Sequence, residues 1–158
     1  MWHVLHLRPR CEKKMRTYLD GLSLTNYLPL ASVTRIYQRR KVVFENPLFP
    51  GYIFAFFNPD QRLSILKSPM LVRIIPVPNQ AQLIYELDQL KAALAENPFL
   101  KARPGMARGD RVRITAGPLR GIEGIIQIMK GSSQVVLSVD AIGQGVAVEV
   151  AMDALETI

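Results

Sequence analysis

A run of aromatic residues between positions 47 and 57 constrains the fold of this chain more than any other segment. The run includes a Pro-Gly turn at Gly51, where glycine permits backbone angles that other residues resist. Because side chains alternate along a strand, the residues that follow divide between two faces. One face holds Tyr52, Phe54 and Phe56, and the other holds Ile53, Ala55 and Phe57. Both faces are apolar, which predicts either a strand covered on both sides or a strand that keeps one face for a partner.

Length and composition indicate a globular protein of one ordinary domain or two small ones. The chain has 158 residues, of which 49% are hydrophobic, too many for a disordered tail. No apolar run approaches the roughly 20 residues that cross a bilayer, and the first residues lack the apolar core of a secretion signal. The lone Cys11 cannot form a disulfide framework. We therefore expect a soluble, cytoplasmic protein with no membrane partner.

The positive charge is concentrated in the first part of the chain. The formal net charge is +7, to which residues 1–97 contribute +6, residues 98–107 contribute +2 and residues 108–158 contribute −1. A basic first part has the sign expected of a nucleic-acid-binding surface. A solvated basic surface without a ligand fits the same count equally well.

Strand-like and helix-like patterns alternate through the first 96 residues. Strand patterns are expected at residues 2–7, 52–57 and 71–77, helix patterns at residues 11–22 and 80–94 with a short helix after Pro59, and a hairpin with a basic tip at residues 32–44. The order of these elements predicts an α+β domain, in which helices pack on a mainly antiparallel sheet.

The composition changes abruptly after this first domain. Residues 97–107 combine two prolines with polar and basic residues, as expected of a linker. Eight of the ten glycines lie between Gly105 and Gly145, among short segments rich in Val and Ile. We predict an N-terminal α+β domain at residues 1–96, a linker at 97–107 and a small SH3-like all-β barrel at 108–158.

Individual glycines of the second region have assigned structural roles. Gly117 with Pro118 suits a tight turn between strands. Gly121 and Gly124 suit corners where a side chain would obstruct the approach of the backbone. A stable helical form of this region is not expected, because each glycine costs roughly 1 kcal/mol in a helix interior.

The sequence contains no catalytic or metal-binding motif. His3 and His6 fall on opposite faces of their strand, and Cys11 belongs to the apolar stripe of a helix. The patterns CxxC, HExxH, GxSxG and GxxxxGK[ST] are absent. We therefore expect no enzymatic activity, no catalytic residue, no metal site and no cofactor.

The residues alone leave two interpretations of the aromatic strand. It is plain core, or it is an RNA-recognition strand whose exposed rings stack on bases. Two positions depart from the RNA-recognition pattern, since Pro50 stands where Lys or Arg is expected and Ile53 where Gly or Ala is expected.

Two motif blocks resemble those of the NusG family of transcription elongation factors. The first reads Pro-Leu-Phe-Pro-Gly-Tyr-Ile-Phe at residues 47–54, followed by Ser-Pro-X-Leu-Val-Arg at residues 68–73. The second is the KOW-like Gly-Asp-X-Val-Arg-Ile-X-X-Gly-Pro at residues 109–118. The resemblance covers essentially the whole chain, and the order and separation of the blocks make it more specific than either block alone.

The resemblance implies partners and binding residues. It implies an N-terminal domain that binds the clamp helices of the largest RNA polymerase subunit through Tyr52 and Phe54, with Phe49 in support. It implies that Arg8, Lys14 and Arg73 lie toward upstream DNA or the non-template strand. The barrel of this family docks a small-subunit ribosomal protein or Rho, and we expect a monomer.

The compact linker resembles that of the specialised paralogues of RfaH type. That resemblance implies a non-catalytic factor that suppresses pausing and acts in antitermination of particular operons. Two other classes stay open on sequence grounds. One is an RNA- or ribosome-binding module that does not bind polymerase, and the other is a structural adaptor whose barrel recruits a partner.

Overall fold

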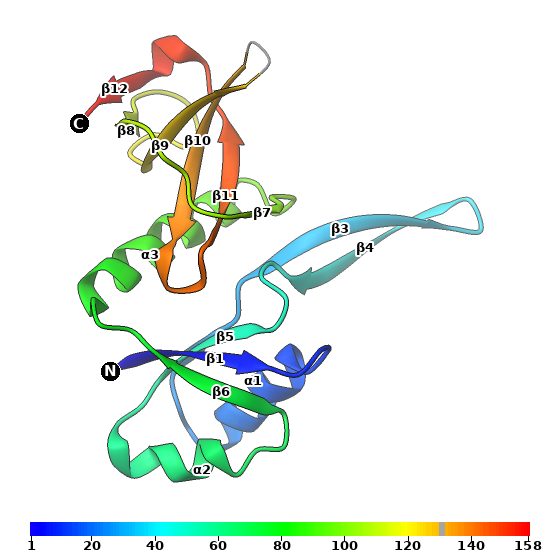
Figure 1. Ribbon diagram of the computed structural model, residues 1–158. Helices are drawn as coiled ribbons and strands as arrows, with labels where there is room; N and C mark the ends of the chain where they lie inside the picture. The colour runs from blue at the N-terminus through cyan, green and yellow to red at the C-terminus, as the bar shows by residue number, and fades with distance from the viewer. Residues whose placement is uncertain (130–131) are drawn as a thin grey trace. The chain divides into compact units, whose positions relative to one another are not determined.

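The computed structural model describes residues 1–129 and 132–158, which form two compact units (Figure 1). The first unit comprises residues 1–30 and 47–81, and the second comprises residues 31–46 and 82–158. No helix among the described residues is both long enough and apolar enough to span a membrane.

The first unit contains a four-stranded antiparallel sheet with the order β2-β5-β1-β6. Its strands are β1 (Trp2–Leu7), β2 (Asn26–Tyr27), β5 (Tyr52–Phe56) and β6 (Leu71–Pro76). The aromatic strand β5 is therefore central, as its two apolar faces predict. Val4 on β1 lies opposite Phe54 on β5.

Two helices and a 3-10 turn accompany this sheet: α1 (Glu12–Gly21), η1 (Pro59–Gln61) and α2 (Arg62–Leu66). The stripe of α1 predicted to face inward does so through Met15 and Leu19. These side chains join Ile53, Ala55 and Phe57 of the aromatic run in one buried cluster. Ile53, Ala55 and Phe57, which alternation places on one face, therefore all belong to the core.

The second unit contains a six-stranded antiparallel sheet with the order β12-β8-β9-β10-β11-β7. Its strands are β7 (Ala102–Pro104), β8 (Arg111–Ile114), β9 (Glu123–Met129), β10 (Ser132–Val139), β11 (Gln144–Glu149) and β12 (Leu155–Thr157), with the 3-10 turns η2 (Asp140–Ile142) and η3 (Met152–Ala154). Ser133, Val135, Leu137 and Val139 of β10 are buried, as period-two patterning requires, and Val136 between them is buried as well. β7 falls inside the segment predicted to be a linker and pairs with β11.

Two glycines of this sheet leave no room for a side chain. A Cβ atom on Gly124 would lie 2.5 Å from the Val136 carbonyl oxygen, and one on Gly145 would lie 2.5 Å from that of Leu137. Gly121 has a different requirement, since nothing lies within 4 Å of its Cβ position but its φ is +91°. The crowding predicted for Gly124 is confirmed, whereas Gly121 is needed for its left-handed backbone.

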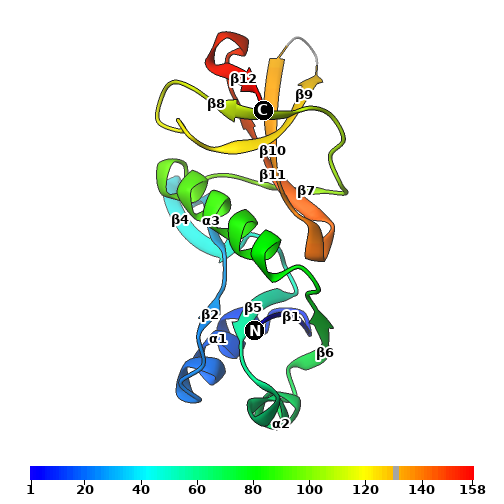
Figure 2. The same cartoon turned by 90° about the vertical axis from the view of Figure 1, so that its left-hand side faces the viewer.

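The second unit also contains a two-stranded sheet and a helix. β3 (Leu30–Tyr37) and β4 (Arg40–Pro47) pair only with each other, as the expected hairpin at residues 32–44 requires, and Figure 1 shows them as a long ribbon. α3 (Gln80–Glu96) is a continuous helix (Figure 2) whose buried side chains within this unit include Leu83, Leu87 and Leu90.

Candidate functional site

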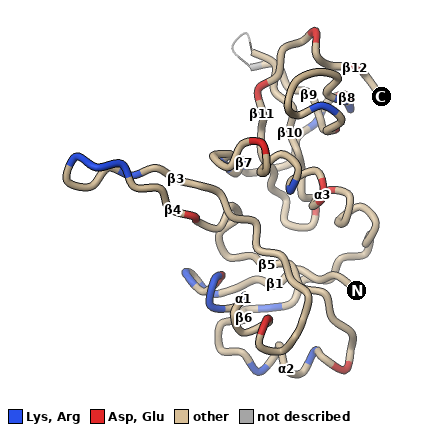
Figure 3. The backbone as a smooth tube through the Cα atoms, turned by 180° about the vertical axis from the view of Figure 1, so that it is seen from behind, with Lys and Arg blue, Asp and Glu red and all other residues tan. Residues whose placement is uncertain are grey.

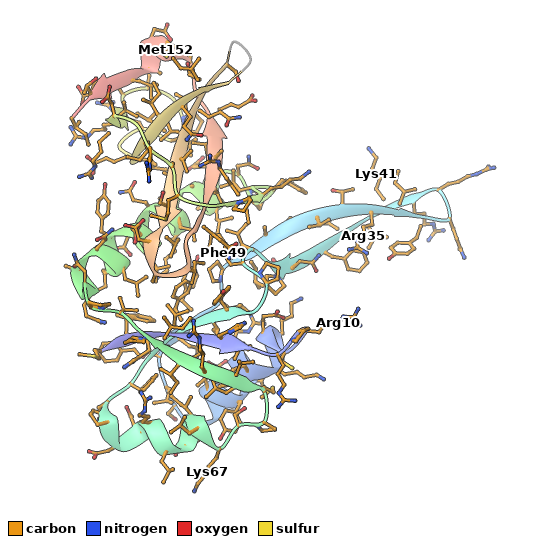
Figure 4. All side chains as sticks on the ribbon, in the orientation of Figure 1. Arg10, Arg35, Lys41, Phe49, Lys67 and Met152 are labelled. Atoms are coloured by element: carbon orange, nitrogen blue, oxygen red, sulfur yellow. The ribbon has the colours of Figure 1, made fainter. Side chains whose placement is uncertain are left out.

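Two of the three predicted polymerase-binding residues, Tyr52 and Phe54, lie on the face of β5 opposite the buried cluster. Phe54 is fully buried together with Val4, the residue opposite it in the register. Phe49 is also buried, and it lies in the turn that precedes β5 (Figure 4). Tyr52 is half-buried. Of the three predicted residues, Tyr52 is thus the one with a side chain that reaches the surface.

Two aromatic pairs flank the buried Val4–Phe54 pair. The rings of His6 and Tyr52 stack at 5.2 Å between centroids, and those of Trp2 and Phe56 meet edge to face at 5.7 Å. The register places His6 opposite Tyr52 and Trp2 opposite Phe56. We call these four side chains the aromatic face. Phe56 is 46% exposed and the other three are half-buried.

A buried carboxylate holds the turn that leads into the aromatic face. Glu12 is 6% exposed, and its Oε1 accepts a hydrogen bond of 2.9 Å from the backbone N–H of Gly51. The Gly51 carbonyl in turn accepts a hydrogen bond of 2.8 Å from the N–H of Leu7. Since Gly51 has φ +90°, the glycine and the carboxylate together fix where β5 begins.

The predicted nucleic-acid residues are all exposed, but they come from different elements. Arg8 follows β1, Lys14 lies on α1 and Arg73 lies on β6. Arg8 and Arg73 are brought near one another, because the N–H of Arg8 donates to the Met70 carbonyl at 2.9 Å and Arg73 lies opposite His6. Figure 3 shows basic positions along α1, on β6 and in the segment that follows β1.

The histidines have structural surroundings. His3 stacks on Phe57 with 4.0 Å between ring centroids, and burial lowers the pKa of its imidazole. His6 stacks on Tyr52 on the other face of the sheet, as the alternation of β1 predicts. Across residues 1–129 and 132–158, no group of three or more His, Cys, Asp or Glu side chains is placed to hold a metal ion.

Within the second unit, α3 contacts the six-stranded sheet through polar side chains. The Tyr85 hydroxyl donates to Glu123 at 2.7 Å, and the Glu123 N–H donates to Gln89 at 2.8 Å. The Asp140 N–H donates to both carboxylate oxygens of Glu86, at 3.3 and 3.2 Å. These residues line a hollow of about 590 Å³.

Two carboxylates at the contact between α3 and the sheet have pKa values shifted in opposite directions. Burial, followed by the nearby negative charge of Asp140, raises the pKa of Glu86 to about 8. Glu123 behaves in the opposite way, because hydrogen bonds from Tyr85 and then Arg113 lower its pKa. Arg113 completes this end with ion pairs of 3.0 Å to Glu123 and 3.1 Å to Glu156.

Sequence reasoning missed Trp2, His6 and Glu12 as parts of this site, and it left Phe56 unassigned. Alternation places Trp2 and His6 on one face of β1, so the face itself could be read from the sequence. Their partners could not, because the pairing of β1 with β5 joins residues about fifty positions apart. The contact of Glu12 with Gly51 likewise spans 39 positions.

Fold and site together define an α+β protein whose first unit carries an aromatic face and whose second unit is built on a six-stranded antiparallel sheet. The family model described as "Transcription termination factor nusG" matches residues 1–90. The chain belongs to the NusG family, whose members are transcription termination and antitermination factors and not enzymes.

Two relatives extend the similarity over the full chain. The transcription termination/antitermination protein NusG of Borreliella burgdorferi is 23% identical over 180 residues, covering 99% of this chain and 98% of the relative. A solved structure on domain interaction in Thermotoga maritima NusG has a TM-score of 0.50 at 19% identity, covering 99% of this chain and 96% of that one. The predicted α+β fold followed by an all-antiparallel β region is thereby confirmed.

Proposed function

We propose that this protein is a transcription elongation factor that binds RNA polymerase, suppresses pausing and acts in antitermination. The observation that carries the proposal is the aromatic face, in which two partly exposed ring pairs flank the buried Phe54. Partly exposed aromatic residues around a buried anchor are the composition of a protein-binding surface.

The proposed partner of this face is the clamp-helix pair of the largest polymerase subunit. Tyr52 makes the direct contact in this proposal, while Phe54 and Phe49 support it from within. A factor that binds one clamp conformation more tightly than another shifts the population toward that conformation. Suppression of pausing then follows from binding alone, and no nucleotide is consumed.

The basic side chains of the first unit supply a contact with DNA in the elongation complex. Arg8, Lys14 and Arg73 are exposed, and in this proposal they face upstream DNA or the non-template strand. Cations that contact phosphates position a protein without reading sequence. Preference for particular operons, as in the RfaH-type paralogues, would require base contacts in addition.

The barrel supplies a second docking site in this proposal. Its partner is a small-subunit ribosomal protein or Rho, by analogy with the family. The domain limits at residues 96 and 108 and the monomeric state belong to the same proposal. Size-exclusion chromatography with light scattering measures the oligomeric state directly.

A binding experiment with one substituted residue on the aromatic face tests the central claim. Tyr52→Ala in the full chain should weaken binding to an isolated clamp-helix fragment by at least about tenfold, because truncating an aromatic hot spot at an interface core costs about 2 kcal/mol or more. The matched control is Leu63→Ala, a large apolar side chain that is 62% exposed in the same unit. Equal binding by both variants and the unsubstituted chain would contradict the proposal.

Two further measurements separate this proposal from the alternative. In vitro transcription on a template with a strong pause should show a shorter pause with the unsubstituted protein than with Tyr52→Ala. The alternative, an RNA- or ribosome-binding module, is favoured by the basic charge of residues 1–97. It predicts tight, salt-dependent binding to single-stranded RNA without polymerase and no effect of Tyr52→Ala on the pause.

A further inference from the structure

The ribbon of β3 and β4 carries four cations that the proposed function does not use. Arg35, Arg39, Arg40 and Lys41 are exposed, and none of them forms an ion pair with a residue in the described part of the chain. Between residues 31 and 46 the only acidic side chain is that of Glu45, so this segment has a net charge of +3 (four cations less one anion). Figure 3 shows the basic positions gathered at the tip.

Several apolar side chains of the ribbon are exposed in addition to the cations. Ile36 is 71% exposed and Val43 is 56% exposed, and the rings of Tyr37 and Phe44 meet edge to face at 6.0 Å. Because side chains alternate along a strand, both faces of the ribbon combine cations with apolar groups. Figure 4 shows Arg35 and Lys41 pointing away from the strands. Nothing in the described second unit covers either face.

The backbone of the ribbon is well defined at both ends. Gln38 and Arg39 have φ values of 46° and 67°, the left-handed conformations of a two-residue hairpin turn. At the base, Ala31 is buried, and the Ser32 N–H donates to the Pro98 carbonyl at 2.7 Å. The base of the ribbon is thus anchored by burial and a backbone hydrogen bond. At the tip, two non-glycine residues adopt positive φ, at a cost in strain.

We infer that the β3–β4 ribbon is a second nucleic-acid surface, which enters the major groove of duplex DNA. A major groove about 12 Å wide admits a two-stranded β-ribbon, and uncovered cations on both faces can reach the phosphates that border the groove. Arg39 and Arg40 at the tip have the fork geometry that pairs with guanine edges, and Ile36 and Val43 can contact thymine methyl groups.

Duplex DNA fits this ribbon better than single-stranded RNA does. Single strands are held mainly by bases stacked on free aromatic rings. The ribbon has only two rings, Tyr37 and Phe44, and they contact each other. The inference goes beyond the proposed function, since it involves other residues in another unit than Arg8, Lys14 and Arg73, and it does not require polymerase.

The test compares two triple variants of the full chain that carry the same change in net charge. The ribbon variant combines Arg39→Gln, Arg40→Gln and Lys41→Gln, and the control combines Arg62→Gln, Lys67→Gln and Lys101→Gln, which are also exposed cations. Binding to a fluorescent mixed-sequence DNA duplex is followed by anisotropy between about 50 and 200 mM salt.

The ribbon variant should bind at least about tenfold more weakly at the low-salt end. Its plot of log affinity against log salt should lose about 1 to 3 units of slope, because each lost phosphate contact removes about 0.9 and the two arginines can reach either phosphates or guanine edges. The control should keep most of the slope. An equal loss in both variants would mean that net charge alone drives binding, which would overturn the inference.

Two further nucleic-acid probes test insertion into the major groove and the preference for duplex DNA over single-stranded RNA. A duplex with bulky substituents at the thymine C5 position, which project into the major groove, should lose the ribbon-dependent part of the affinity. Unchanged binding to that duplex would overturn insertion into the groove, and tighter ribbon-dependent binding to single-stranded RNA than to duplex would overturn the assignment to DNA. Failure here leaves the clamp-helix experiment unaffected, because Tyr52 is not on the ribbon.

Discussion

The two hairpins of the second unit, β3–β4 and β10–β11, are built from similar residues, but the first is largely exposed and the second largely buried. Both are antiparallel and rich in β-branched side chains. In β10 five of eight residues are buried, whereas in β3 only Ala31 is. Local preference thus produces the strands in both cases, and burial depends on which other strands lie beside them.

The difference has an energetic meaning. The β10–β11 pair lies between β9 and β7 in a six-stranded sheet, so its apolar side chains contribute to the stability of that sheet. A two-stranded ribbon alone is marginal in water. The ribbon is supported at its base by the hydrogen bond from the Ser32 N–H to the Pro98 carbonyl, and its exposed apolar side chains contribute little to the stability of the fold.

The largest effect is expected at Gly145, where the backbone of β10 leaves no room for a side chain on β11. Gly145→Val should destabilise the second unit by more than about 4 kcal/mol, because its Cβ would lie 2.5 Å from the Leu137 carbonyl oxygen and 3.1 Å from Ser138 Cα. These are backbone atoms of the neighbouring strand, which cannot move without breaking the ladder. Hydrogen exchange resolved along the chain measures the loss of stability in the six-stranded sheet separately from the first unit.

The matched control for this variant is Gly143→Ala in the turn that precedes β11. Gly143 has φ +62° and nothing within 4 Å of its Cβ position, so alanine there should cost only about 1 to 2 kcal/mol, from its backbone conformation. If Gly145→Val were no worse than Gly143→Ala, close packing of the backbones would not distinguish β10–β11 from the ribbon.

The sequence predicts a strand of this fold when the pattern that specifies it lies within the strand itself. The division of the aromatic run into two faces and the burial of Val135, Leu137 and Val139 follow from period-two patterning, and the structure confirms both. The burial of Val136, which lies between them in β10, does not follow from it. The strands β7 and β12 were not predicted. Each has three residues and exists only because it pairs with β11 or β8, and so short a segment carries no periodicity of its own.

The same limit applies to the candidate site. The glycine at position 51 was predicted from its turn, but the carboxylate of Glu12 that binds its N–H lies 39 positions away. The sequence likewise indicated that Phe54 shares a face with Tyr52, but it did not indicate that Phe54 is buried while Tyr52 reaches the surface. Exposure depends on neighbours that are distant in sequence.

An intermediate effect is expected from pH on the stability of the second unit. In the folded chain the pKa of Glu86 is raised to about 8, so between its ordinary pKa of 4.5 and 8 the folded state binds a proton that the unfolded chain has released. Stability should therefore fall as pH rises through this range, by about 1 to 2 kcal/mol between pH of about 6.5 and 8, and level off above it.

The dependence of stability on pH is measured by urea unfolding at several pH values, with hydrogen exchange as the readout for the second unit. Glu86→Gln should remove most of it, because the amide is neutral at every pH and its oxygen can still accept from the Asp140 N–H. A wild-type stability that rises with pH over this range would contradict the assignment.

The smallest effect is expected from truncating the ribbon itself, and it decides whether the two hairpins differ as described. Ile36→Ala should change the free energy of unfolding by less than about 0.5 kcal/mol, because that side chain is 71% exposed. Leu137→Ala, at a position only 3% exposed on β10, should cost about 2 to 5 kcal/mol. Both are measured by chemical denaturation of the full chain. A loss from Ile36→Ala close to that from Leu137→Ala would mean that the ribbon is packed in solution, and its apolar side chains would then be stabilising the fold instead of remaining available for DNA.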